Sequence, residues 1–91
     1  MTAGPMHPRQ ALARDEALAW IAELFEQPAA TLEPATTRGD IAAWDSLGQL
    51  VLMSALDQRF GIRLTQEELA SLNSIQDILD VLRNYGALSE P

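Results

Sequence analysis

The sequence predicts an all-α domain, a small bundle of three longer helices and one short helix with a long loop between the first and second helices. Apolar residues recur at helical spacing in three segments, and serine, threonine and glycine stand where helix ends are expected. No segment alternates apolar and polar residues as a half-buried strand does. With 91 residues, of which 47% are hydrophobic, the chain suits one domain with a single modest core.

The first helix is expected over residues 9–27, after an N-terminal tail over residues 1–8. Its core face is formed by apolar residues at positions i, i+3, i+4 and i+7, which are Leu18, Ile21, Ala22 and Phe25. Pro28 is expected to end this helix, because proline disfavours the helical conformation of the residue before it.

A loop of about 18 residues, over 28–45, is expected to follow. Its apolar residues are spaced so that they can hold the loop against the core; they are Leu32, Ile41 and Trp44. A loop of this length is unusual in a small domain and is often functional.

The second helix is expected from Ser46 to Phe60, because Gly61 suits a left-handed cap at its C-terminal end. The tetrapeptide "SLGQ" has the pattern of a capping box, with Ser46 as N-cap and the Gln49 side chain reaching back. On these local grounds alone, Ser46 is the residue that starts the helix.

The helical positions of the second segment give it two apolar sides. At ~100° per residue, one arc forms the core face, and its members are Leu52, Met53, Leu56 and Phe60. Leu47, Leu50 and Val51 fall on the opposite half, which is normally polar in a small bundle. Either the long loop covers these three residues or they form an exposed patch for a partner.

Two more helices complete the predicted bundle. A short helix over 66–71 is expected to begin with Thr65 as N-cap and Glu68 in a capping box. A final helix is expected to begin at Ser74 and end at Gly86, with a core face of Ile75, Ile78, Leu79 and Leu82. The folded domain therefore spans residues 9–86, and residues 87–91 are expected to be a C-terminal tail.

The charge of the chain restricts its partners. The net charge is -7, and all six basic residues are arginine, so no basic face is expected to bind nucleic acid. No apolar run reaches the roughly 18 residues that span a membrane, and the N-terminus lacks the apolar segment of a signal peptide. The absence of cysteine fits a cytoplasmic protein, and we expect a monomer.

The chain also lacks the groups that an enzyme needs. The single histidine, His7, lies in the predicted tail, so a serine nucleophile has no base beside it. No His or Cys cluster forms a metal site and no glycine-rich loop binds phosphate, so no catalytic or metal-ligating residue is predicted. A phosphate attached to Ser46 would nevertheless be favoured by the helix N-terminus, and Asp45 could contact its divalent metal or only balance the helix dipole.

At this point the segments "WDSLGQLVLMSALDQRFGIRLTQEEL" and "SIQDILDVL" resemble the acyl carrier protein family, which includes the carrier domains of polyketide and nonribosomal peptide assembly. Asp45, Ser46 and Leu47 match the family's Asp-Ser-Leu signature. The segment "ALDQRFGI" matches the usual end of the second helix at the family's spacing, and the resemblance covers about residues 11–85.

The resemblance implies a non-catalytic carrier. A phosphopantetheinyl transferase would attach 4′-phosphopantetheine from coenzyme A to Ser46 with Mg²⁺, and the arm's thiol would hold an acyl group as a thioester. Asp45 would assist the transferase and its metal, and Leu47, Leu50 and Val51 would contact partners. The other implied partners are an acyl-loading ligase or transferase and a downstream synthase or acyltransferase of a lipid, polyketide or other specialised pathway.

Departures from the fatty-acid carriers narrow this expectation. Val51, Gln58 and Arg59 stand where acids are common, Asp57 is the only acid in the second helix after Ser46, and Gly48 replaces a frequent polar residue. We therefore expect a discrete carrier for a specialised pathway. The alternatives are an aminoacyl or peptidyl carrier, against which "WDSL" argues, and an unmodified helical interaction module of the same fold.

Overall fold

A computed structural model describes residues 11–89 of the chain. The predicted N-terminal tail over residues 1–8, including His7, and the last two residues lie outside the described residues.

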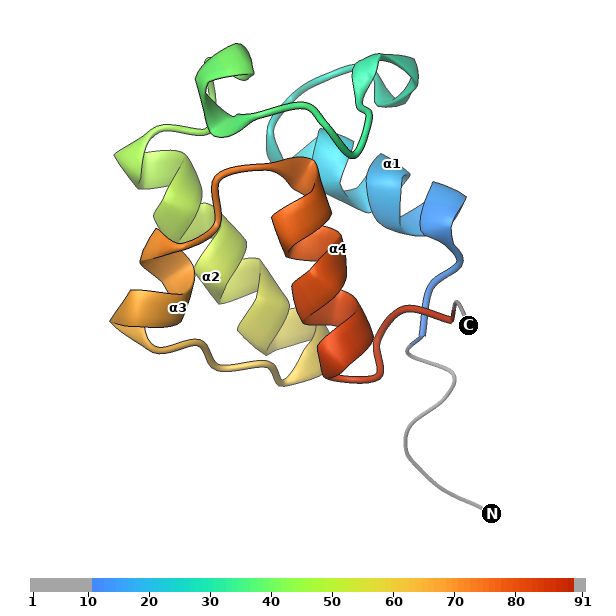
Figure 1. The fold of residues 1–91 in the computed structure, drawn as a ribbon, viewed down its shortest axis with the longest axis vertical. Coiled ribbons are helices and arrows are strands. Elements are labelled where there is room, and N and C mark those ends of the chain that lie inside the picture. Colours follow the sequence, from blue (N-terminus) through green and yellow to red (C-terminus); the bar gives the residue numbers. More distant parts are fainter. Residues whose placement is uncertain (1–10, 90–91) are drawn as a thin grey trace.

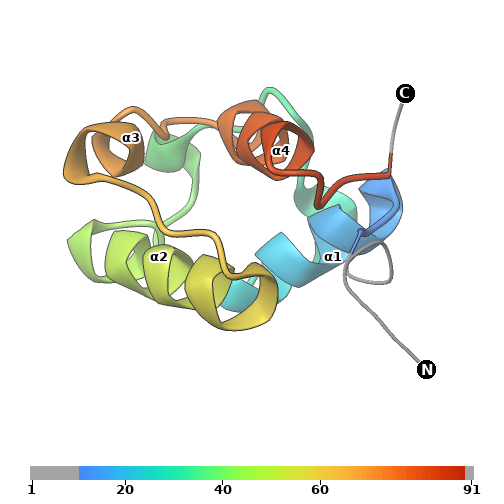
Figure 2. The same ribbon diagram turned by 90° about the horizontal axis from the view of Figure 1, so that it is seen from below.

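The described chain forms four α-helices and two short 3-10 helices, which are α1 (Arg14–Leu24), η2 (Ala29–Thr31), η3 (Arg38–Asp40), α2 (Ser46–Phe60), α3 (Gln66–Ala70) and α4 (Ile75–Asn84). Figure 1 shows their arrangement, and Figure 2 shows that α1 and α2 lie on one side of the domain and α3 and α4 on the other. Over residues 11–89 there are isolated bridges but no strands, so the prediction of an all-α bundle is confirmed.

The core lies between the two layers of helices. Its largest fully buried side chains come from α1, the long loop, α2 and α4, and they are Ile21, Phe25, Trp44, Leu52, Leu56, Ile75, Ile78, Leu79 and Leu82. Most residues of the predicted core faces are therefore buried. The exceptions are Leu18, Met53 and Phe60, which lie at the edge of this core and are partly buried.

The end of α1 differs from the prediction. The helix ends at Leu24, before Pro28, because Glu26 adopts the left-handed conformation with φ 56°. The Gln27 N–H then donates to the carbonyl of Ala22 at 2.8 Å, which satisfies one of the last helical carbonyls. Proline therefore follows the stop signal and is not itself the signal.

The two ends of the described chain pair with each other. The Leu12 N–H donates to the Ala87 carbonyl at 2.9 Å, and the Ser89 N–H donates to the Leu12 carbonyl at 2.8 Å. Leu12, Ala87 and Leu88 are buried. The segment before α1 is extended for this reason, and the packed domain continues at least to Ser89, beyond the predicted boundary at Gly86.

The end of α2 and the starts of α3 and α4 follow the predicted signals. Gly61 caps α2 in the left-handed conformation with φ 69°, and the Ile62 N–H donates to the Leu56 carbonyl. The capping box predicted at Thr65 with Glu68 is confirmed. The last helix begins after Ser74, as predicted, and Ser74 forms a capping box with Asp77.

Candidate functional site

The long loop is fixed to the core immediately before α2. Its three predicted apolar residues, Leu32, Ile41 and Trp44, are all buried. The Trp44 ring stacks on Phe25, the C-cap of α1, with ring centres 5.0 Å apart, and its indole N–H donates to Gln49 Oε1 at 2.6 Å. These two contacts of Trp44 fix the backbone immediately before α2.

Asp45, not Ser46, is the N-cap of α2. Asp45 Oδ1 accepts the Gly48 N–H at 2.9 Å, and Ser46 is the first residue of the helix. The predicted Ser46–Gln49 capping box is therefore wrong by one residue, because aspartate caps a helix as well as serine does. Ser46 is exposed, and its hydroxyl makes no hydrogen bond with any residue between 11 and 89.

Gln49 has a different role from the one predicted for it. Its side chain is buried, and in addition to accepting from Trp44 it donates from Nε2 to the Leu69 carbonyl of α3 at 2.5 Å. It is the one buried polar residue in the described part of the chain. Gln49 thus joins the loop, α2 and α3 beside Ser46.

Gly48 lets the loop approach the first turn of α2. A Cβ atom at this position would overlap with the backbone carbonyl oxygen of Ala43. The glycine that departs from the common family pattern is therefore required by the close approach of two backbone segments.

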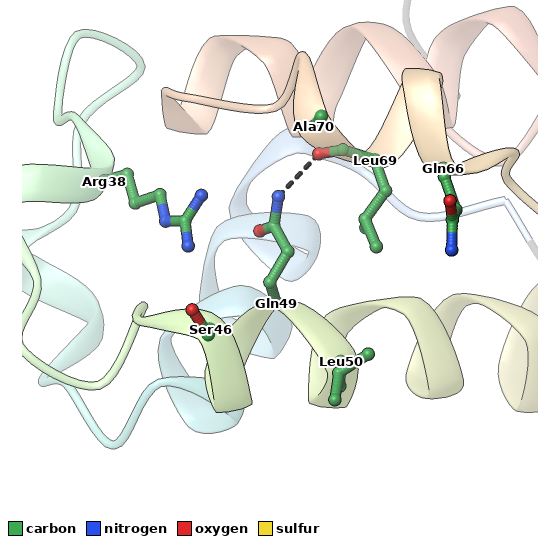
Figure 3. A pocket seen from close by; sticks show the side chains of 7 residues that line it. All are labelled: Arg38, Ser46, Gln49, Leu50, Gln66, Leu69 and Ala70. Atoms are coloured by element: carbon green, nitrogen blue, oxygen red, sulfur yellow. Dashed lines mark hydrogen bonds between the residues drawn. The ribbon is translucent and has the colours of Figure 1, made fainter.

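A pocket of about 300 Å³ opens between α2 and α3 (Figure 3). It is lined by Arg38, Ser46, Gln49, Leu50, Gln66, Leu69 and Ala70. The Ser46 hydroxyl thus borders a space that has apolar walls and amide groups. Of the seven residues that line it, only Arg38 is charged.

Arg38 is positioned by two contacts that the sequence did not indicate. Its backbone N–H donates to the Asn73 carbonyl at 2.8 Å, and its Nε–H donates to the Trp44 carbonyl at 3.1 Å.

The 3-10 turn that contains Arg38 is closed by the Asp40 carboxylate, which accepts from the N–H and the hydroxyl of Thr37 at 3.0 and 2.9 Å. These two hydrogen bonds, the backbone one first, lower the pKa of Asp40.

The sequence left open whether the long loop covers the second apolar side of α2 or leaves it exposed to solvent, and the exposed fractions of its side chains answer this question. Leu47, Leu50 and Val51 are 70%, 53% and 41% exposed, so the loop does not cover them. We call these three residues the apolar patch. Leu47 and Val51 also border a second groove of about 270 Å³, which Glu26 and Asp45 line with carboxylates.

The family model of the phosphopantetheine attachment site matches residues 19–82, which run from α1 into α4. The acyl carrier protein of Thermosynechococcus vestitus is 34% identical over 62 residues, which are 68% of this chain and 75% of that protein. The chain belongs to the acyl carrier protein family. The acyl carrier protein of Acidothermus cellulolyticus is 27% identical over 78 residues, which are 81% of this chain and 93% of that protein.

The protein is therefore a non-catalytic carrier, and its cofactor is phosphopantetheine. The geometry beside Ser46 fits this group, because an exposed hydroxyl without a hydrogen-bond partner in residues 11–89 borders a pocket that contains a guanidinium group.

None of the helices in the described range is both long enough and apolar enough to cross a membrane.

Proposed function

We propose that this carrier holds acyl groups as thioesters on a 4′-phosphopantetheine arm attached to Ser46, and that it delivers them to enzymes of a lipid, polyketide or other specialised pathway. The supporting observation is the Ser46 hydroxyl, which lies in the Asp-Ser-Leu sequence at the first residue of α2 and is exposed at the rim of the pocket.

The attachment step uses Ser46 as the nucleophile. A bond forms between Ser46 Oγ and the phosphorus of coenzyme A that carries the pantetheine, and the bond from that phosphorus to the bridging oxygen of the pyrophosphate breaks. The nucleotide part of coenzyme A leaves, and the serine proton passes to a base of the transferase. The attached arm supplies the thiol, which the chain itself lacks because it has no cysteine.

Asp45 is placed to assist this step. Its Oδ1 is occupied by the Gly48 N–H, whereas its side chain is exposed and offers Oδ2 to an Mg²⁺ ion bound by the transferase and coenzyme A. In the part of the chain that the structure describes, no three potential metal ligands come together. Asp45 would therefore contribute a single ligand to a metal held mainly by the partner.

The apolar patch, Leu47, Leu50 and Val51, is the proposed docking surface for the transferase, for the acyl-loading ligase or transferase and for the downstream synthase or acyltransferase. It lies on the first two turns of α2, beside Ser46 and Asp45. Only Asp57 is acidic in α2, so apolar contact contributes more to docking than charge does. This composition favours a specialised pathway over the basic docking sites of fatty-acid synthesis.

Mass measurement after modification tests the proposal. The purified protein is incubated with coenzyme A, Mg²⁺ and a broad-specificity phosphopantetheinyl transferase, and its intact mass is recorded. We expect a gain of one phosphopantetheine in the wild type and none in Ser46→Ala. Ser54→Ala is the matched control, since Ser54 is an exposed serine of the same helix, and it should be modified like the wild type. Failure of the wild type with several transferases would refute the proposal.

A further inference from the structure

We propose that Arg38 is the positioning residue for the arm, and that its guanidinium binds the phosphodiester attached to Ser46. This inference rests on the proposed attachment site. It assigns a function to a loop residue that no local pattern in the sequence distinguishes.

Arg38 and Ser46 lie at the same pocket although they belong to different elements. Arg38 comes from η3 in the long loop, and Ser46 is the first residue of α2. Figure 3 shows the guanidinium extending from the loop into the pocket, on the side where the Ser46 hydroxyl lies. The phosphorus of the arm would be bonded directly to Ser46 Oγ, so the phosphodiester must begin at the rim that Arg38 lines.

The Arg38 guanidinium has N–H donors that make no hydrogen bond within residues 11–89. Its Nε–H is engaged with the Trp44 carbonyl, which fixes the plane of the group and leaves the N–H groups on both terminal nitrogens for a ligand. A planar guanidinium with two parallel donors matches a phosphate group better than an ammonium group does. The Trp44 contact therefore orients the arginine for an anion before any anion arrives.

No carboxylate of the described chain neutralises Arg38. The nearest acid in sequence, Asp40, accepts two hydrogen bonds from Thr37, and neither it nor any other acid in residues 11–89 forms an ion pair with Arg38. In contrast, Arg63 and Arg83 pair with Asp57 and Asp80. A cation without an anionic partner is notable in a chain with net charge -7.

The charge next to Ser46 makes such a cation useful. Asp45 precedes the serine and is the helix cap, so a phosphodiester on Ser46 places a second negative charge beside a carboxylate. Like charges this close destabilise each other. Arg38 offsets this repulsion and holds the first part of the arm over the pocket instead of allowing it to rotate into solvent.

The test compares the melting temperature of the apo and modified forms of four proteins: the wild type, Arg38→Gln, Arg38→Lys and Arg63→Gln. Modification is first verified by intact mass, so that a failure of the attachment itself is recognised separately. We expect modification to raise the melting temperature of the wild type and of Arg63→Gln by about 4 °C. The rise should vanish in Arg38→Gln and be reduced in Arg38→Lys.

Salt separates charge pairing from a structural role of Arg38. The rise in the wild type should shrink when NaCl is increased from about 0.1 M to about 1 M, because the screening length falls from ~10 Å to ~3 Å. The guanidinium ¹⁵N resonances of Arg38 should also shift on modification of the wild type. If Arg38→Gln does not fold, Arg38→Lys and these resonances decide the question.

Three results would overturn the inference while leaving the attachment to Ser46 intact. The first is an equal rise in melting temperature for Arg38→Gln and the wild type. The second is no rise in the modified wild type, and the third is guanidinium resonances of Arg38 that do not move on modification. Absence of any mass gain in the wild type would instead refute the attachment on which the inference rests.

Discussion

At the scale of single residues, Gln49 joins the long loop, α2 and α3 beside Ser46. One amide accepts a hydrogen bond from the loop and donates one to α3, so its oxygen and its nitrogen each satisfy a buried partner. Buried polar groups that lose their partners are costly, because their hydration is not recovered. The shape of the pocket beside Ser46 therefore depends on this side chain being an amide.

The substitution Gln49→Glu tests this dependence. A carboxylate can still accept from Trp44, but it cannot donate to the Leu69 carbonyl, and its charge would be buried. We expect the free energy of unfolding at pH 7 to fall by about 2 kcal/mol, measured by urea denaturation. Gln58→Glu, at an exposed position of the same helix, should change it by less than about 0.5 kcal/mol.

The pH dependence of Gln49→Glu has a defined sign. Burial disfavours the charged form, so the pKa of the new carboxyl is expected to be higher in the folded than in the unfolded chain. Its penalty should be absent below the unfolded value of about 4.3 and should grow as the pH rises above it. A difference from the wild type that stays constant between pH 4 and pH 7 would contradict this explanation.

The residue scale is also where the sequence was least informative. Asp45 and Ser46 are both good N-caps, so the sequence alone could not decide which residue caps α2. The decision is made by the buried Trp44, which fixes the backbone just before Asp45. Arg38 and Gln49 depend on contacts with Asn73 and Leu69, which are distant in sequence, and no local pattern indicates such contacts.

At the scale of elements, the lengths of α1 and α2 are set by different stop signals. Gly61 ends α2 where it was predicted, since glycine adopts a left-handed conformation without strain. α1 ends at Leu24 because Glu26, two residues later, adopts the same conformation, although a glutamate there is strained by roughly 1 kcal/mol or more. Sequence patterns identify the first kind of stop signal but not the second.

Replacing this residue should stabilise the protein. We expect Glu26→Gly to raise the free energy of unfolding by up to about 1 kcal/mol, because the relief of strain exceeds the added flexibility of glycine in the unfolded chain. Thermal melting followed by circular dichroism measures the effect. Glu23→Gly, inside α1, should instead lower stability by about 1 kcal/mol. If both variants are destabilised, the strain at Glu26 is absent.

At the scale of the whole molecule, α2 has one buried and one exposed apolar surface. Leu52 and Leu56 are fully buried between the helix layers, whereas the apolar patch of Leu47, Leu50 and Val51 is exposed on the other side. The periodicity of the sequence showed both surfaces. Only the path of the loop, which does not cover the patch, determines that the second surface is exposed.

The substitution Leu50→Asp should therefore affect docking and not folding. We expect its melting temperature to stay within about 3 °C of the wild type, because Leu50 is 53% exposed. The kcat/KM of the phosphopantetheinyl transferase for this variant should fall at least about tenfold, which corresponds to ~1.4 kcal/mol of lost binding in the transition state.

A matched variant on the buried face makes this experiment decisive. Leu52→Asp places the same charge in the core, where Leu52 has no exposed surface, and should unfold the protein. If Leu50→Asp also melts far below the wild type, the patch contributes to the fold. If Leu50→Asp keeps its full kcat/KM, the transferase docks elsewhere.

The pairing of Leu12 with Leu88 brings the two ends of the described chain to one side of the domain, whereas α2 begins on the opposite side (Figure 1). A tether or a fused protein joined at either end would therefore lie away from Ser46 and would not obstruct the apolar patch. The same geometry suits immobilisation through either terminus, because Ser46 of every copy would then face the solution. Binding of partners can thus be measured on immobilised, unmutated protein without altering the proposed docking surface.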